Sequence, residues 1–178
     1  PFLPFTDDAI TPIGWRCLDG TFYVDKNGDP YIVFCREWQQ VTDGEIHAMK
    51  LTKDLSAAAG EPILLFKASQ PDWADKTRDM FVTDGPFMYR TKCGRLLMIW
   101  STFTKKGYVQ AVAYSDNGEI DGNWLHEKPM FEENGGHGMI FDDYEGKKYL
   151  ILHSPNEFPD ERPVLFEICE ENGTLKLV

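Results

Sequence analysis

Short apolar runs separated by polar turns recur along the whole chain, and their alternation is typical of β-strands rather than helices. Three stretches follow the same order: a polar residue and a Gly, a short apolar run, a Gly-containing turn, and a second apolar run. They begin at Asp19, Asp84 and His137, with turns at 26–28, 92–94 and 144–146. Such turns supply the positive φ angle that a tight hairpin needs, so each stretch predicts an antiparallel pair of strands.

Two further strands are expected behind each hairpin. Alternating residues predict a third strand at 45–51, 108–114 and 164–169, and a less regular fourth strand fits 62–66, 124–131 and 175–178. Four antiparallel strands per unit is the pattern of a propeller blade. We therefore predict an all-β fold, a β-propeller with blades at about 12–66, 80–131 and 135–178. The one helical signal is a single turn at 55–59.

Three consecutive β-meanders could instead form a sandwich of two packed sheets. A sandwich does not require a polar residue and a Gly at the same place in every unit, and this recurrence favours the propeller. Small propellers usually need four or more blades to close their ring. The sequence, which opens at Pro1, is therefore expected to be the C-terminal part of a larger propeller. Its missing blades would come from the rest of the protein or from another chain.

Composition and charge narrow the range of partners. Hydrophobic residues make up 42% of the 178 residues, which is enough for a buried core. The formal net charge is −11 and the basic residues are scattered, so neither nucleic acid nor membrane is an expected partner. The four cysteines lack zinc-binding spacing. Cys17 and Cys35 flank the first hairpin and are expected to be thiols rather than a disulfide, which leaves the redox compartment open.

Equivalent positions in a propeller point to a common site, because the first strand of each blade lines the central channel. Asp19, Asp84 and His137 head these strands, so the fold would gather two carboxyls and an imidazole around one pocket. Crowded carboxylates shift one another's pKa values, as a general acid near neutral pH requires. An Asp before Gly can also simply form a turn. Turn chemistry does not explain His137, which glycines surround and which is expected where the backbone approaches other atoms closely.

These segments resemble glycoside hydrolase family 43. Residues 17–25 are similar to the strand that presents the aspartate tuning the pKa of the catalytic acid, and residues 82–87 to the segment that carries this acid. Residues 136–138 are similar to the segment whose histidine reaches the channel axis. The resemblance covers essentially the whole chain and makes Asp19 and Asp84 the expected catalytic residues. It implies a five-bladed propeller and an inverting glycosidase of arabinose- or xylose-containing glycans, of the α-L-arabinofuranosidase or β-xylosidase type.

Two departures from the family's pattern bear on activity. The family's general acid is usually a Glu, one methylene longer than Asp84, so Glu37 or Glu45 could serve instead, although each also fits a structural or solvated role. The family's catalytic base is an aspartate on the first blade, and no strand is predicted before Asp19. Asp7 and Asp8 lie in a Pro-rich leader and do not qualify. The isolated chain is therefore expected to be inactive.

Sugar pockets combine flat apolar surfaces with planar hydrogen-bond donors. Large side chains in predicted loops near strand ends could supply both: Trp38, Trp73, Phe103 and Arg162. The preferred substrate contacts are Trp38 and Arg162, together with His137 and Glu37. Trp73 could instead cap the edge of its blade. Trp100 lies inside a predicted strand and is expected in the core.

The spacing of residues demands no metal or other cofactor, although the resemblance allows a cation beside His137. Two other functions stay open. The chain could be a non-catalytic carbohydrate-binding propeller that kept the fold and lost the chemistry, which Asp84 and the missing base favour. It could also belong to a related hydrolase of fructose or mannose linkages, since a shared fold does not fix the substrate.

Overall fold

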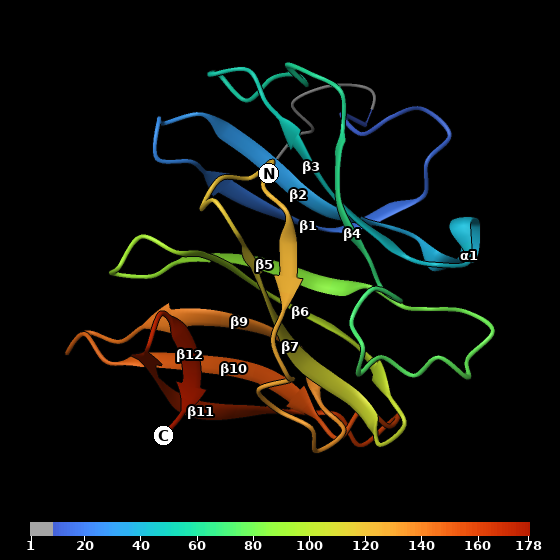
Figure 1. Ribbon diagram of the computed structural model, residues 1–178, viewed down its shortest axis with the longest axis vertical. Coiled ribbons are helices and arrows are strands. Elements are labelled where there is room, and N and C mark those ends of the chain that lie inside the picture. Colours follow the sequence, from blue (N-terminus) through green and yellow to red (C-terminus); the bar gives the residue numbers. More distant parts are fainter. Residues whose placement is uncertain (1–8) are drawn as a thin grey trace.

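The computed structural model describes residues 9–178 and contains three four-stranded antiparallel sheets (Figure 1). The first sheet comprises β1 (Cys17–Val24), β2 (Pro30–Arg36), β3 (Glu45–Lys50) and β4 (Ile63–Lys67). The second comprises β5 (Asp84–Arg90), β6 (Leu96–Thr104), β7 (Gly107–Ser115) and β8 (Trp124–His126). The third comprises β9 (Gly136–Asp142), β10 (Lys148–Ser154), β11 (Arg162–Glu171) and β12 (Thr174–Leu177). Each sheet is a meander, so the predicted blades are confirmed and the two-layered sandwich is excluded.

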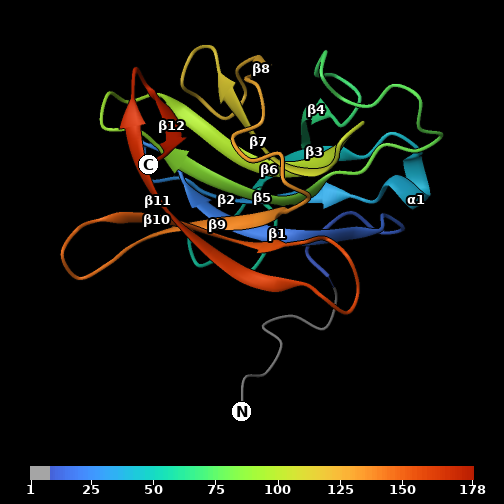
Figure 2. The same cartoon turned by 90° about the horizontal axis from the view of Figure 1, so that it is seen from below.

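The three blades lie in chain order, with the first strands of neighbouring blades in contact. Strand β5 contacts both β1 and β9, and Figure 1 shows the first, second and third blades stacked from blue through green to red. In Figure 2 the last strands, β4, β8 and β12, lie along the side opposite β1 and β9. The first strands therefore form the inner edge of the molecule. No helix within residues 9–178 is long and apolar enough to cross a membrane.

The middle blade explains why one strand is apolar without alternation. Both faces of its sheet are covered, and a strand buried on two faces needs apolar residues at every position. In β6, the even-numbered residues from Leu96 to Trp100 pack against the first blade, and Leu97 and Ile99 pack against the third. Trp100 is 0% exposed, as predicted for a core residue. The two interfaces between blades are therefore the hydrophobic cores of the molecule.

A β-bulge interrupts the start of each inner strand. Strand pairing skips residues 19–20 in β1, 85–86 in β5 and 137–138 in β9. The first residue of each bulge has a positive φ: 55° at Asp19, 50° at Gly85 and 56° at His137. These three are therefore the structurally equivalent positions. The predicted equivalence of Asp19, Asp84 and His137 is wrong by one residue at Asp84, which precedes its bulge.

The single helix lies in a different place from the predicted one. Helix α1 (Trp38–Val41) follows β2 directly, whereas residues 55–59 form no helix. There, Asp54 accepts hydrogen bonds from Thr52 and Ser56, and Leu55 has a positive φ of 64°. Such local side-chain bonds compete with helix formation. Strand β8 also ends earlier than predicted. Residues 127–131 stay attached to β7 through a bond from the N–H of Glu127 to the oxygen of Val112 and a bridge between Gln110 and Phe131.

The four cysteines are free thiols, as expected for Cys17 and Cys35. Those two residues are not directly opposite each other, because Cys17 pairs with Arg36 and Leu18 pairs with Cys35. Burial raises the pKa of the Cys35 thiol well above its usual value, so it packs as a small apolar residue.

Candidate active site

A hollow of about 170 Å³ lies where the three bulges meet. Its lining comes entirely from the starts of the three inner strands: residues 19–21, 85–87 and 137–139. Asp19 and His137 are its ionisable side chains, and they are 18% and 42% exposed. The fold thus brings together two of the residues that the sequence singled out, although they are far apart in the chain.

Asp19 connects the first blade to the other two. Its Oδ2 accepts a hydrogen bond from the backbone N–H of Gly85 at 3.0 Å, and its Oδ1 lies 3.8 Å from Nε2 of His137. The glycine at position 85 leaves room for His137, because a Cβ there would lie 2.7 Å from Cδ2 of that ring. The missing side chain allows the imidazole to lie against the backbone of the middle blade.

Glycines also flank His137 because atoms of the neighbouring strands leave no room for a Cβ. A Cβ on Gly136 would lie 2.6 Å from Oγ of Ser101 and 2.8 Å from Cε1 of Tyr108. The backbone N–H of His137 also donates to Oγ of Ser101 at 2.7 Å. The close backbone approach expected at this histidine is therefore present, and its partner is the middle blade.

Asp84 is held by a tyrosine on the third strand of its own blade. Its Oδ2 accepts a hydrogen bond from the hydroxyl of Tyr108 at 2.8 Å. Burial raises the pKa of Asp84, the bond from Tyr108 opposes this rise, and the charge of Asp19 adds to it. Tyr108 is 2% exposed, and its ring stacks on His153 with centroids 5.6 Å apart.

Ser101, Tyr108 and His153 were not identified from the sequence. In the pattern of polar and apolar positions they are ordinary strand residues, and no motif distinguishes them. Tyr108 reaches Asp84 across its own blade, and Ser101 reaches His137 across the interface with the third blade. Local periodicity encodes neither contact. His153 nonetheless lies close enough to Asp84 for its charge to lower the pKa of that carboxyl.

Glu37 adds a third carboxyl group to the cluster. It caps the start of α1 and is half-buried. Burial raises the pKa of Glu37, and the charges of Asp84 and Asp19 raise it further, while Arg16 opposes them. Among residues 9–178, its carboxylate has no hydrogen-bond or ion-pair partner. Asp19, Glu37 and Asp84 are thus electrostatically coupled, although Asp84 and Glu37 do not line the hollow.

Glu45, the other glutamate considered from the sequence, is a structural residue. It is 8% exposed and pairs with Arg36, His47 and Lys67. Burial alone would raise the pKa of Glu45, but the hydrogen bonds from His47 and Lys67 outweigh burial and lower it. A carboxylate held by three cationic or polar partners is poorly suited to carry a proton.

A second hollow of about 310 Å³ adjoins the first and shares His137 with it. Its polar lining includes His153, Glu161 and Arg162. Arg162 is the first residue of β11 rather than a loop residue, and its Nη1 donates to the backbone oxygens of Pro159 and Glu161. The predicted contact Arg162 therefore lies beside the predicted contact His137.

The aromatic residues considered from the sequence have different surroundings. Trp38 is the first residue of α1, not part of a loop, and is half-buried next to Glu37. Phe103 belongs to β6, also not a loop, and its ring lies 4.2 Å beneath the guanidinium of Arg78. Trp73 does lie in a loop, and its Nε1 donates to the backbone oxygen of Glu127 at 2.7 Å. Trp38 is adjacent in sequence to Glu37, and the ring of Phe103 lies 5.0 Å from that of Tyr108, which binds Asp84.

No group of three or more His, Cys, Asp and Glu side chains within residues 9–178 is arranged to hold a metal ion. The cation that the resemblance allows beside His137 would have the imidazole and the Asp19 carboxylate as neighbours. A Ca²⁺ ion takes about six to eight oxygen ligands. The described residues alone therefore do not fit such a cation.

Known proteins share both the sequence pattern and the fold of this chain. The model of glycosyl hydrolases family 43 matches residues 3–169. The structure of an endo-arabinase from Bacteroides thetaiotaomicron is 43% identical with a TM-score of 0.91, and covers 97% of this chain and 63% of its own. No curated protein sequence matches the chain.

Two other solved structures share the fold at lower identity. An endo-1,4-β-xylanase from Bacteroides thetaiotaomicron is 21% identical with a TM-score of 0.78, over 97% of this chain and 61% of its own. An α-L-arabinofuranosidase from Lactobacillus brevis is 17% identical with a TM-score of 0.74, over 93% of this chain and 57% of its own. The chain thus spans less than two thirds of the length of each of these proteins.

Proposed function

The chain belongs to glycosyl hydrolases family 43, and on this basis we propose that it is the acid-bearing part of a glycosidase acting on arabinan or a related arabinose- or xylose-containing glycan. The observation that carries the proposal is the coupled cluster of Asp19, Glu37 and Asp84 at the inner edge. Close carboxylates keep one of their number protonated near neutral pH, as a general acid requires. The 43% identity to an endo-arabinase makes arabinan the first substrate to test.

The proposed reaction is hydrolysis with inversion at the anomeric carbon. In such enzymes a carboxylic acid protonates the leaving oxygen while a carboxylate about 6.5 to 9.5 Å away activates water on the opposite face. The cluster supplies the acid, and Asp19 supplies a fixed negative charge, because the N–H of Gly85 binds its carboxylate. We assign the catalytic base to a further blade. Asp7 and Asp8, which the sequence analysis set aside, lie outside the described residues.

Apolar side chains on the two end faces support the assignment of further blades. On the outer face of the third blade, Met139, Ile151 and Leu165 form a cross-strand row and are 57%, 37% and 54% exposed. On the outer face of the first blade, Phe22 and Leu64 on the two edge strands are 55% and 45% exposed, while Met49 between them is buried. A contiguous row of exposed apolar residues, such as that of the third blade, marks a surface that another element covers. We propose that one further blade packs on each face and that together they close a five-bladed ring.

Substrate contacts are proposed for the residues around the two hollows. His137 and Arg162 would contact the sugar in the second hollow, where both contribute to the lining. Trp38, next to Glu37, would provide an aromatic surface for a neighbouring sugar. These contacts would orient the glycosidic bond over the carboxyl cluster.

The proposal is tested on the longer protein that contains the remaining blades. We expect it to hydrolyse linear arabinan or aryl arabinofuranosides, with xylan, fructan and mannan as comparison substrates. Asp19→Asn removes the negative charge that supports the acid, so it should lower kcat/KM by up to the roughly 10²- to 10⁴-fold that proton transfer contributes, while sugar binding measured by calorimetry is retained. The control Asp142→Asn makes the same change at the far end of β9, where the carboxylate pairs with Lys148, and should leave kcat/KM unchanged.

Two other results would point to the alternative functions. Sugar binding without turnover in the unaltered protein would favour the non-catalytic carbohydrate-binding propeller. Turnover restricted to fructan or mannan would favour the related hydrolases of fructose or mannose linkages. Either result would contradict the proposed arabinan or xylan glycosidase.

A further inference from the structure

We propose that Glu37, rather than Asp84, is the general acid that protonates the leaving oxygen. This inference rests on the proposed glycosidase function and identifies the residue that performs its proton-transfer step. Three observations carry it: the placement of Glu37 by the fold, the lack of a partner for its carboxyl group, and the hydrogen bond that occupies Asp84.

The fold places Glu37 at the same end of the blades as Asp19 and Asp84. Strand β2 runs antiparallel to β1, so its last residue, Arg36, pairs with Cys17 at the start of β1. Glu37 follows directly, and its backbone N–H donates to the oxygen of Arg16 at 2.8 Å. Its side chain therefore originates next to the segment that leads into Asp19.

The segment after α1 ties Glu37 to the second blade. The N–H of Gly44 donates to the oxygen of Phe81 at 2.8 Å, and the N–H of Phe81 donates to the oxygen of Thr42 at 2.9 Å. A Cβ on Gly44 would lie 2.7 Å from Oγ1 of Thr83, so these chains are in close contact. Residues 42–44 thus hold α1 against the residues that immediately precede Asp84. This pairing accounts for the effect of the Asp84 charge on the pKa of Glu37.

The two carboxyl groups differ in their freedom to carry and transfer a proton. Asp84 accepts the hydrogen bond of buried Tyr108, which fixes its orientation and opposes the rise in its pKa that burial causes. Glu37 is half-buried, and within residues 9–178 nothing donates to its carboxylate. Burial and the neighbouring charges of Asp84 and Asp19 favour its protonated form. Asp84 then acts through Glu37 as a positioning residue, because its charge helps keep the proton on Glu37.

The step consumes one glycoside and one water. The Glu37 carboxyl gives its proton to the glycosidic oxygen as the anomeric C–O bond breaks and its electron pair passes to that oxygen. The oxygen of water bonds to the anomeric carbon, and a water proton passes to the carboxylate base of the further blade. The base later releases this proton and Glu37 takes one up, so both carboxyl groups return to their starting states.

The test compares Glu37→Gln with Asp84→Asn in the longer protein, on two substrates. Arabinan needs a protonated leaving group, whereas a dinitrophenyl arabinofuranoside has a leaving group that departs without a proton. Glu37→Gln should lose about 10²- to 10⁴-fold in kcat/KM on arabinan but much less on the dinitrophenyl substrate. Activity normally falls at high pH as the general acid loses its proton, and this basic limb of the pH profile should be absent in Glu37→Gln. Substitution of a merely structural residue would leave the limb in place. Asp84→Asn should reduce turnover of both substrates alike and move that limb to lower pH.

Further variants separate the outcomes. Glu45→Gln removes a glutamate already held by three partners and should keep the leaving-group dependence of the unaltered protein. Glu37→Asp retains a carboxyl group and should restore the basic limb with lower kcat, and thermal unfolding checks that each variant is folded. If the unaltered protein hydrolyses neither substrate, the proposed function fails. If it hydrolyses both and the leaving-group dependence appears in Asp84→Asn instead, only the role of Glu37 is overturned.

Discussion

Two side chains of the site depend on backbone conformations that L-residues rarely adopt. Asp19 and His137 have φ values of 55° and 56°, and each such residue costs roughly 1–3 kcal/mol. The bonds from Gly85 N–H to Asp19 and from His137 N–H to Ser101 hold these conformations in place. A bulge also redirects the side chain at its first position. The strain is therefore found at the residues that face the hollow.

Another single residue should control stability in acid. His126 lies between Phe66 and Trp100, and within the described residues neither ring nitrogen has a hydrogen-bond partner. Burial lowers the pKa of His126 from 6.5 to about 4. The folded state therefore keeps the imidazole neutral at pH values where the unfolded chain binds a proton. This contribution to stability is complete above pH 6.5 and is lost as the pH falls toward 4, by about 3 kcal/mol in total.

Urea unfolding at a series of pH values between these limits measures this loss. His126→Leu has no ionisable group at this position, so its free energy of unfolding should fall less steeply over the same range. Equal slopes for the two proteins would show that other groups cause the acid sensitivity.

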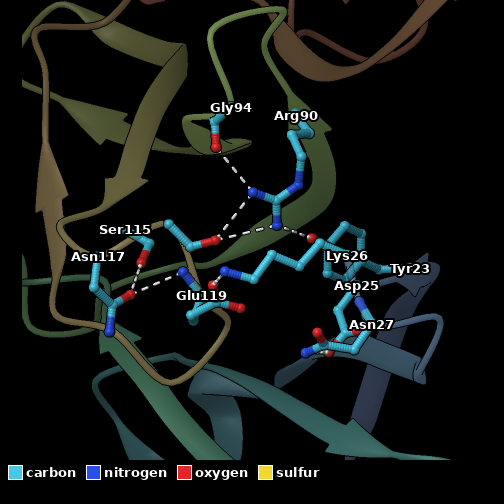
Figure 3. A network of polar contacts seen from close by, with 10 residues as sticks. Tyr23, Asp25, Lys26, Asn27, Arg90, Gly94, Ser115, Asn117 and Glu119 are labelled. Carbon is cyan, nitrogen blue, oxygen red and sulfur yellow. Dashed lines mark hydrogen bonds and ion pairs between the residues drawn. The ribbon is translucent and has the colours of Figure 1, made fainter.

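At the scale of elements, one arginine joins the first two blades at the end opposite the hollow (Figure 3). Arg90, the last residue of β5, donates to the backbone oxygens of Gly94 and Gly118 and to the hydroxyl of Tyr23 on β1, at 2.7 to 3.1 Å. Lys26 forms an ion pair with Glu119 in the same network, but its side chain is 58% exposed. These two cations allow buried and exposed polar contacts between blades to be compared directly.

We expect Arg90→Met to lower the free energy of unfolding by about 2 kcal/mol, because it leaves two part-buried oxygen atoms, of Gly118 and Tyr23, without their donor. Lys26→Met should lower it by less than about 1 kcal/mol, since an exposed ion pair is solvated when broken. Urea unfolding of both variants measures the difference. A larger loss for Lys26→Met would contradict this view of how the blades are joined.

The hairpins and their order follow from the sequence because they depend on local signals: Gly-containing turns and alternating residues. The register inside the bulges does not. Asp84-Gly85 has the same letters as Asp19-Gly20, but the positive φ falls on Asp19 in one and Gly85 in the other. The position of Glu37 depends on the pairing of residues 42–44 with 81–83, which no local pattern encodes. The site was therefore predictable as a meeting of strands but not atom by atom.

At the scale of the whole molecule, the blades differ in how completely they are covered. The middle blade is buried on both faces, whereas the third blade has an apolar face toward solvent. On the outer face of the first blade, Phe22 and Leu64 are exposed, but Phe34 and Met49 are buried. The apolar row of the third blade is continuous across three strands, as Met139 pairs with Ile151 and Ile151 with Leu165. The middle blade packs on its neighbours through apolar side chains of the same kind.

The exposed row of the third blade predicts that one substitution has effects of different size in two settings. Leu165→Ser should lower the free energy of unfolding of the longer protein by about 2 kcal/mol, because a further blade would bury this side chain. In the 178-residue chain alone, where Leu165 is 54% exposed, the change should be below about 0.5 kcal/mol. Leu125→Ser, at a 46% exposed position on β8 of the middle blade, should have little effect in either setting. If the proposed further blades cover the end faces and supply the base, the chain alone should also bind an apolar dye and hydrolyse no arabinan. Equal, small effects of Leu165→Ser in both proteins would show that no blade covers this face.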